Sequence, residues 1–228
     1  MAKSIRFMAG SALAILILCG RTWAGPLEDG LSALDAKNPA KAVESLTAWL
    51  ATKPPVDDAR LKGIEAMVQA HALSGTLHLA AELLEAEAAN STAPKPYQAR
   101  ISFLLAQVNS AMGRTSEAIS TYLFAVQTDP GAAYLKDIDL TLGDLYLMRR
   151  KVSDRGLEFL ETFIKKNAGD PRVDAVQRLY IGALLTSSRP GDRAKAIDAD
   201  IQYDGTKPNK PRARTLLDIV RNSKQDKD

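Results

Sequence analysis

The residues best suited to metal chemistry are two histidines, His71 and His78, which stand on either side of a Ser74-Gly75 break. We expect His71 near the end of one helix and His78 near the start of the next. A metal ion held across this turn would need a further ligand, and Glu82, one turn beyond His78, is the nearest candidate. Two imidazoles at a turn are more often solvated or cap the helix ends. The sequence therefore predicts no metal site.

Carboxylates that could serve as a general acid and a general base also occur in pairs. The pairs are Asp57 with Asp58, Asp137 with Asp139, and Glu158 with Glu161. The first two stand where helices are expected to begin, and carboxylates there cap free amide groups and offset the helix dipole. We expect structural roles for them. Glu82, Glu85 and Glu87 are expected to line a solvated helix face.

Motifs for other chemistries are absent from the sequence. There is no G-x-x-x-x-G-K-[ST] phosphate loop, no G-x-G-x-x-G turn, no H-E-x-x-H pair and no G-x-S-x-G nucleophile turn. The one cysteine, Cys19, lies before a predicted cleavage site at Ala24, so the mature chain would have no thiol for catalysis, disulfides or zinc binding. We predict no catalytic residue, no cofactor and no enzyme activity.

Residues 1–24 have the layout of a secretory signal peptide. A basic start is followed by the apolar run Phe7–Cys19 and then by the small residues Thr22 and Ala24, three and one places before the predicted cut. As a helix this run would reach only about 20 Å, short of a hydrocarbon core of about 30 Å. An uncleaved anchor is the alternative, and the large Leu18 argues against lipidation of Cys19. We expect cleavage after Ala24 and a periplasmic protein, or a secreted one if the host lacks an outer membrane.

The remaining chain has a globular composition and no net charge. Of 228 residues, 46% are hydrophobic and 25% are charged, which excludes wholesale disorder. The formal charge of +3 comes from Lys3, Arg6 and Arg21, so the later residues hold 27 basic and 27 acidic side chains. This balance gives no argument for a nucleic-acid partner. No later run approaches the 18 apolar residues of a membrane span, so none is predicted in the mature chain.

Prolines divide the body of the chain into blocks of similar length. They fall at 54–55, 94–96, 130, 171 and 208, in steps of 36 to 41 residues. Between them, apolar residues three and four apart predict helices. Each block has one internal break, at Lys37-Asn38-Pro39, Ser74-Gly75, Met112-Gly113-Arg114, Arg149-Arg150-Lys151 or Ser188-Arg189-Pro190-Gly191. This pattern predicts two antiparallel helices per block, repeated five times.

The third block, Arg100–Pro130, has the clearest internal pattern. A Leu105-Ala106 pair lies in its first helix and Gly113 at its turn, followed by Ala118, Tyr122, Ala125 and Pro130. The block resembles a tetratricopeptide repeat (TPR), whose consensus sets a Leu-small pair before downstream Ala, aromatic, Ala and Pro positions. Small residues at Ala106 and Ala118 would let the two helices approach closely.

The other blocks repeat this spacing more loosely. The matching first-helix positions are Gly30, Val68, Ala106, Gly143 and Gly182, 37 to 39 residues apart, against about 34 in the family. Trp49 stands where a small residue is usual. The resemblance implies an all-α fold, an α-solenoid of about five antiparallel helix hairpins over residues 25–204. Independent hairpins with chance spacing are the alternative.

Residues 205–228 are expected to close the array. Lys207–Arg214 looks like an extended linker, and Arg212–Arg221 looks like a capping helix with the apolar stripe Leu216, Leu217 and Val220. The basic tail is either solvated or touches anionic lipid or a partner.

The resemblance also implies a binding surface, because the first helices of stacked hairpins line a concave groove. The residues expected there are Lys62, Glu65 and Gln69 from the second block, Arg100, Phe103, Gln107 and Ser110 from the third, and Asp137, Leu140, Asp144 and Leu147 from the fourth. This mixture does not support the Lys, Arg and Asn clamp with which some repeat proteins hold a chaperone's terminal carboxylates. Phe103 is predicted to form an apolar pocket with Leu140 and Leu147, or else to pack between neighbouring hairpins.

A groove without catalytic residues predicts a non-enzymatic scaffold or adaptor. By fold-level analogy, the exported protein would bind a protein or peptide partner of the cell envelope and assist assembly of a pilus, secretion, outer-membrane or cytochrome-maturation complex. The alternatives are a structural spacer or oligomer-forming subunit, including a homo-oligomer, and an accessory of a peptidoglycan-active enzyme.

Overall fold

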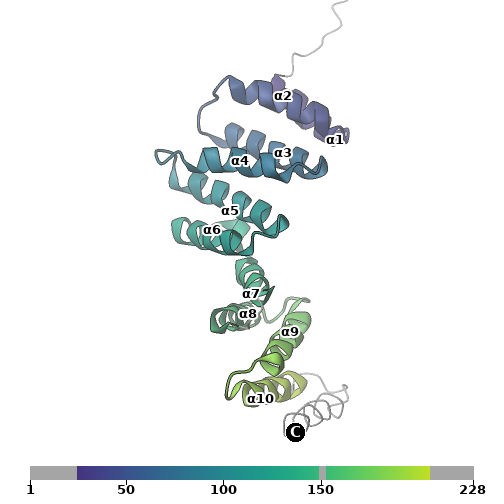
Figure 1. Ribbon diagram of the computed structural model, residues 1–228, viewed down its shortest axis with the longest axis vertical. Coiled ribbons are helices and arrows are strands. Elements are labelled where there is room, and N and C mark those ends of the chain that lie inside the picture. The colour runs from purple at the N-terminus through teal and green to yellow at the C-terminus, as the bar shows by residue number, and fades with distance from the viewer. Residues whose placement is uncertain (1–24, 149–152, 206–228) are drawn as a thin grey trace, which may run out of the picture.

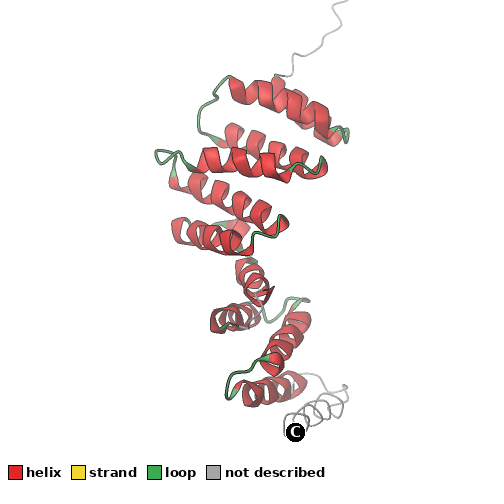
Figure 2. Ribbon diagram, viewed as in Figure 1, coloured by secondary structure: helices red, strands yellow, loops and turns green. Residues whose placement is uncertain are grey.

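The computed structural model describes residues 25–148 and 153–205. The predicted signal peptide (1–24) with Cys19, and the predicted linker, capping helix and basic tail beyond Gly205, lie outside the described residues. Within those residues every regular element is a helix (Figures 1 and 2), so the all-α prediction is confirmed.

The described residues form paired α-helices and one short 3-10 helix, η1. Their bounds are α1 (Pro26–Asp35), α2 (Pro39–Ala51), α3 (Asp58–Leu73), α4 (Leu77–Ala88), α5 (Lys95–Ala111), α6 (Thr115–Thr128), η1 (Ala133–Leu135), α7 (Ile138–Met148), α8 (Asp154–Lys166), α9 (Val173–Thr186) and α10 (Asp192–Gly205). Each odd-numbered α-helix packs against the next one in the chain. The pairs are the predicted hairpins, and we call their members first and second helices.

The turns inside the hairpins use the left-handed backbone region. Gly75, Gly113 and Gly191, with φ angles of 70°, 75° and 84°, follow α3, α5 and α9. Lys37 adopts the same conformation after α1, with a φ angle of 56°. Glycine pays no steric cost there because it has no Cβ atom. These four predicted breaks are confirmed, and the fifth, at 149–151, falls outside the described residues.

Successive hairpins stack into an elongated array (Figure 1). The second helix of each hairpin packs against the first helix of the next, at α2–α3, α4–α5, α6–α7 and α8–α9. The first helices α1, α3 and α5 also contact one another in order. Packing between nearest neighbours defines an α-solenoid, so the structure confirms the predicted solenoid against independent hairpins.

Small residues permit the closest contacts inside the hairpins. A Cβ atom added at Gly30 would stand 2.5 Å from Leu46 Cγ, and one added at Gly143 would stand 2.5 Å from Leu160 Cδ2. In the third hairpin the predicted small and aromatic residues are buried in one cluster, namely Ala106, Ala118 and Tyr122. The predicted role of small residues is therefore confirmed in these three hairpins.

Two positions depart from the predicted pattern. Trp49 fits because its ring occupies the space that a Cβ atom on Gly63 of α3 would need. Gly182 is not a close-contact position, because nothing lies within 4 Å of a Cβ atom added there, and that prediction is wrong. Ala183, the next residue, is buried with Ala196 of α10 instead.

A partly buried ion pair and a hydrogen bond to it join three helices around the second hairpin. Arg60 of α3 pairs with Glu87 of α4, which also accepts a hydrogen bond of 2.7 Å from the Tyr97 hydroxyl of α5. The prediction of a solvated face is wrong for Glu87, which is 9% exposed, because this network needs its carboxylate inside. The predicted cap before α3 is confirmed, since Asp57 accepts a hydrogen bond of 2.9 Å from the Arg60 amide.

Candidate functional site

The residues predicted for the groove lie on α3, on α5, and on α7 or directly before it. Lys62, Gln69 and Gln107 are exposed, whereas Glu65, Arg100, Phe103, Ser110, Asp137, Leu140, Asp144 and Leu147 are half-buried. We call this set the first-helix face. Its half-buried members differ in whether another side chain of the protein already pairs with them or packs against them.

An ion pair joins the first-helix face of α3 to that of α5. Arg100 donates from Nε to Glu65 Oε1 over 2.7 Å, and its Nη2 lies 2.6 Å from the same oxygen. Both side chains remain partly exposed, so the pair contributes at most about 1 kcal/mol. Its consequence for binding is that both charges are already committed to each other.

Phe103 is half-buried and packs against two tyrosines. Its ring centroid lies 5.4 Å from that of Tyr122 in α6 and 4.9 Å from that of Tyr134 in η1. The Arg100 guanidinium stands over the Tyr134 ring at 4.8 Å, a cation–π distance. The predicted alternative, that Phe103 packs between neighbouring hairpins, describes what is observed, and Tyr134 is the residue that the sequence analysis missed.

Leu140 and Leu147 belong to a different apolar cluster from Phe103. They pack with the buried residues Leu160, Phe163 and Val176 of α8 and α9. Phe103 packs with the cluster around Ala106 and Tyr122. The predicted pocket shared by Phe103, Leu140 and Leu147 is therefore wrong, because stacking directs α5 and α7 into separate interfaces.

Asp137 lies directly before α7 and is held by Arg172, which precedes α9. The two side chains are 2.8 Å apart, and Arg172 also contacts Asp170 at 2.7 Å. Hydrogen bonding to this guanidinium lowers the pKa of Asp137, and it lowers the pKa of Asp170 to about 2. Asp139, in the first turn of α7, pairs with Lys166 of α8 at 2.8 Å. Both carboxylates of the predicted acid pair thus have structural partners.

Asp144 is the exception on the first-helix face. It is half-buried in the middle of α7, and no hydrogen-bond or ion-pair partner for it occurs within residues 25–148 and 153–205. Loss of water around the carboxylate raises its pKa above the ordinary value. No described residue neutralises this partly desolvated carboxylate.

The histidines form no ligand set. His71 is 8% exposed, and its Nδ1 lies 2.9 Å from the hydroxyl oxygen of Thr76, the residue directly before α4. Of the two expected roles, solvated or at a helix end, the buried His71 therefore does not take the solvated one. His78 is exposed. In the described part of the chain no group of three or more His, Cys, Asp or Glu side chains is placed to hold a metal ion.

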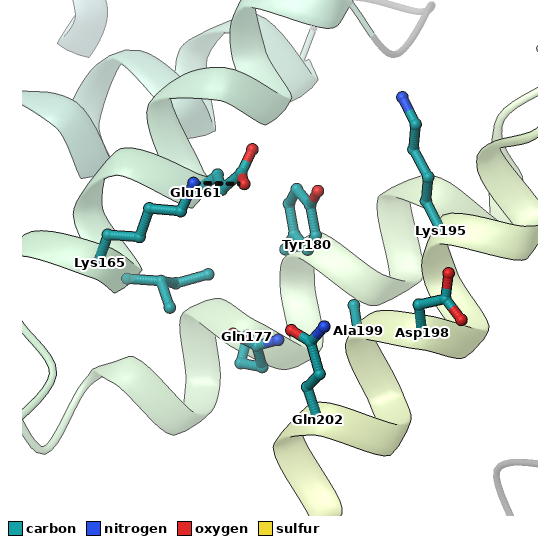
Figure 3. Close-up of a pocket in the computed structure, with 9 residues that line it drawn as sticks. Glu161, Lys165, Gln177, Tyr180, Lys195, Asp198, Ala199 and Gln202 are labelled. Carbon is teal, nitrogen blue, oxygen red and sulfur yellow. Dashed lines mark ion pairs between the residues drawn. The ribbon is translucent and has the colours of Figure 1, made fainter.

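A pocket of about 390 Å³ lies between α8, α9 and α10 (Figure 3). Its lining residues are Glu161, Ile164, Lys165, Gln177, Tyr180, Lys195, Asp198, Ala199 and Gln202. Glu161 and Lys165 pair with each other at 2.7 Å, and burial raises the pKa of Tyr180. This pocket could not be predicted from the sequence, because its walls come from two hairpins and meet only when the hairpins stack.

Comparisons with known proteins identify the fold. No family model matches the sequence, and no curated protein matches it. Two crystal structures of a kinesin light chain-like protein from Podosopora anserina, described as having nearly identical TPR-like repeats, are similar at 19% identity; one is a single-substitution variant. Each match spans 79% of this chain and 92% of the compared chain, with TM-scores of 0.59 and 0.58. The fold is TPR-like.

This similarity supports the arrangement of the TPR-like hairpins and carries no partner over to this chain. None of the described helices has both the length and the apolar character that crossing a membrane requires. What the geometry offers is a surface of first helices with exposed polar side chains and a half-buried carboxylate, Asp144, that no described residue neutralises.

Proposed function

We propose that this protein is a non-enzymatic scaffold or adaptor that binds a protein partner along the first-helix face. We further propose that residues 1–24 export it to the periplasm, or out of the cell if the host lacks an outer membrane. There it would assist assembly of an envelope complex such as a pilus, secretion, outer-membrane or cytochrome-maturation machine. The TPR-like fold supports a protein as the partner, since stacked helical hairpins present extended surfaces of this kind.

The observation that carries the proposal is a row of uncommitted polar side chains on adjoining first helices. Lys62 and Gln69 of α3 and Gln107 of α5 are exposed, and α3 contacts α5. None of the three makes a hydrogen bond or an ion pair within the described residues. Amide side chains can donate to and accept from a peptide main chain, so this row suits a polypeptide ligand.

The experiment is crosslinking in envelopes of the host, followed by affinity purification and mass spectrometry. The test variant carries Gln69→Arg and Gln107→Arg, which place two bulky charges on the first-helix face without lowering helix propensity. The matched control carries Glu82→Arg and Glu85→Arg, at exposed positions of the second helix α4. We expect the test variant to lose a specific partner that the control retains, with both variants as stable as the parent protein.

Two other results would point to different functions. Self-association in sedimentation, with no partner lost from the Gln69→Arg and Gln107→Arg variant, would support the structural spacer or oligomer instead. Turnover of purified peptidoglycan that a single carboxylate substitution abolishes would support an enzyme. Export is tested separately by cell fractionation and N-terminal sequencing, where we expect a mature protein beginning at Gly25.

A further inference from the structure

Three half-buried carboxylates on or beside the first helices α3 and α7 are paired with bases on neighbouring elements. The pairs are Glu65 with Arg100, Asp137 with Arg172, and Asp139 with Lys166. Each pair joins two helices or the segments that lead into them. Asp144, half-buried on α7, departs from this pattern because no described residue neutralises it.

An unpaired, half-buried carboxylate works against the stability of the fold. Removing a charge from water costs free energy, and only a nearby cation or a set of hydrogen bonds offsets that cost. Burial raises the pKa of Asp144, which is the expected response of a carboxyl group that has lost water and gained no partner. Asparagine has nearly the same shape and would avoid the cost, and no described contact of the fold requires the charge.

The surroundings of Asp144 indicate what would bind it. Leu140 and Leu147 lie one turn before and one turn after it, and Met148, also one turn after it, is 73% exposed. The long side chains of Lys and Arg lay an aliphatic stem along apolar surface while their charged end reaches an acidic group. Asp144 also occupies the repeat position of Gln69 and Gln107, 38 and 37 residues apart, so it continues the row to which the partner is assigned.

We propose that Asp144 receives a Lys or Arg side chain of the protein partner, whose stem lies along Leu147 and Met148. This inference rests on the proposed function and adds to it the chemistry of one contact. A charge-assisted hydrogen bond in a partly desolvated setting is stronger than a neutral one. The partner's cation would supply the neutralisation that the described residues lack.

The first test is stability, with a matched pair of substitutions on the same helix. Asp144→Asn should raise the thermal midpoint by about 2 °C, because it removes an unpaired charge. Asp139→Asn should lower it by about 1–3 °C, because it breaks the pair with Lys166. A lower midpoint for Asp144→Asn would show that another group of this chain already neutralises Asp144, and would overturn the proposal.

The second test is binding of the isolated side chains to the full exported protein. The probes are the capped amino acids N-acetyl-lysine methylamide and N-acetyl-arginine methylamide, with the glutamine analogue as the uncharged control. Either or both cations should shift the backbone amide signals of α7, with about tenfold weaker binding to Asp144→Asn and unchanged binding to Asp139→Asn. Equal effects of all three probes, or no effect on α7, would contradict the assignment.

The crosslinking experiment separates this inference from the proposed function. If Gln69→Arg with Gln107→Arg abolishes capture and Asp144→Asn weakens it about tenfold, both stand. If only the glutamine variant loses the partner, the first-helix face binds a protein and the role of Asp144 is wrong. If neither variant changes capture, the proposed function itself fails.

Discussion

Two glycines on first helices should respond in opposite ways to the same substitution. A Cβ atom on Gly143 would stand 2.5 Å from Leu160 Cδ2, 2.8 Å from its Cγ and 3.4 Å from its backbone nitrogen. Leu160 has 0% exposure, so its side chain has no open space into which it could move. Gly182, on α9, has nothing within 4 Å of its added Cβ atom. The stacked architecture therefore predicts that an alanine destabilises the fold at Gly143 and stabilises it at Gly182.

The magnitudes follow from two competing effects. Alanine in a helix interior is favoured over glycine by about 1 kcal/mol. Overfilling a packed contact costs about 1–3 kcal/mol, and at Gly143 the base of the Leu160 side chain is obstructed, which places the cost near the upper end. We expect Gly143→Ala to lose about 1–2 kcal/mol net and about 4 °C of thermal midpoint, and Gly182→Ala to gain about 1 kcal/mol and about 2 °C.

The assay is thermal and guanidinium unfolding of both variants, with amide hydrogen exchange of α7 and α8 to locate the effect. A Leu160→Ala background is the control, because there the added methyl group meets a cavity. Gly143→Ala should be neutral or stabilising in that background, although Leu160→Ala alone costs about 2–5 kcal/mol. Stabilisation by Gly143→Ala in the parent protein would refute the close contact between α7 and α8.

Two more predictions concern a turn conformation and a buried imidazole. Lys37 has a φ angle of 56°, so Lys37→Gly should stabilise the protein by about 0.5–1 kcal/mol in urea unfolding. Gly113 has a φ angle of 75°, so Gly113→Ala should destabilise it by about 1 kcal/mol. A change in stability of the same sign for both variants would contradict the turn assignment. Burial, followed by the charge on His78, lowers the pKa of His71 below its ordinary value of 6.5, so the unfolded chain binds more protons than the folded one. The stabilising effect of neutral His71 is therefore complete above pH 6.5 and is lost as the pH falls toward the pKa of the folded state. Between pH 7.5 and pH 5.5 the thermal midpoint of the His71→Gln variant should fall less than that of the parent protein.

The hairpin architecture could be predicted from the sequence because it depends on local signals. The breaks at Gly75, Gly113 and Gly191 mark positions where the chain must enter the left-handed region, and the apolar periodicity between them specifies helices. Gly143, at the small-residue position of its first helix, likewise predicted a close contact between the two helices of its hairpin. Such signals lie within one hairpin, so the amino-acid sequence alone determined them.

The candidate site depended on contacts between hairpins, which no local pattern contains. The sequence alone allowed Phe103 to line a groove. In the structure Tyr134, from a linker about 30 residues later in the chain, packs against it. The sequence likewise allowed Glu65 to bind a partner through its charge, but in the structure Arg100 of α5 places its Nη2 atom 2.6 Å from Glu65 Oε1. Helical spacing tells which side chains share a face, but the stacking of neighbouring hairpins decides which of them are satisfied. For that reason only the tertiary structure could distinguish Asp144, a half-buried carboxylate with no partner among the described residues, from the acids that hold the array together.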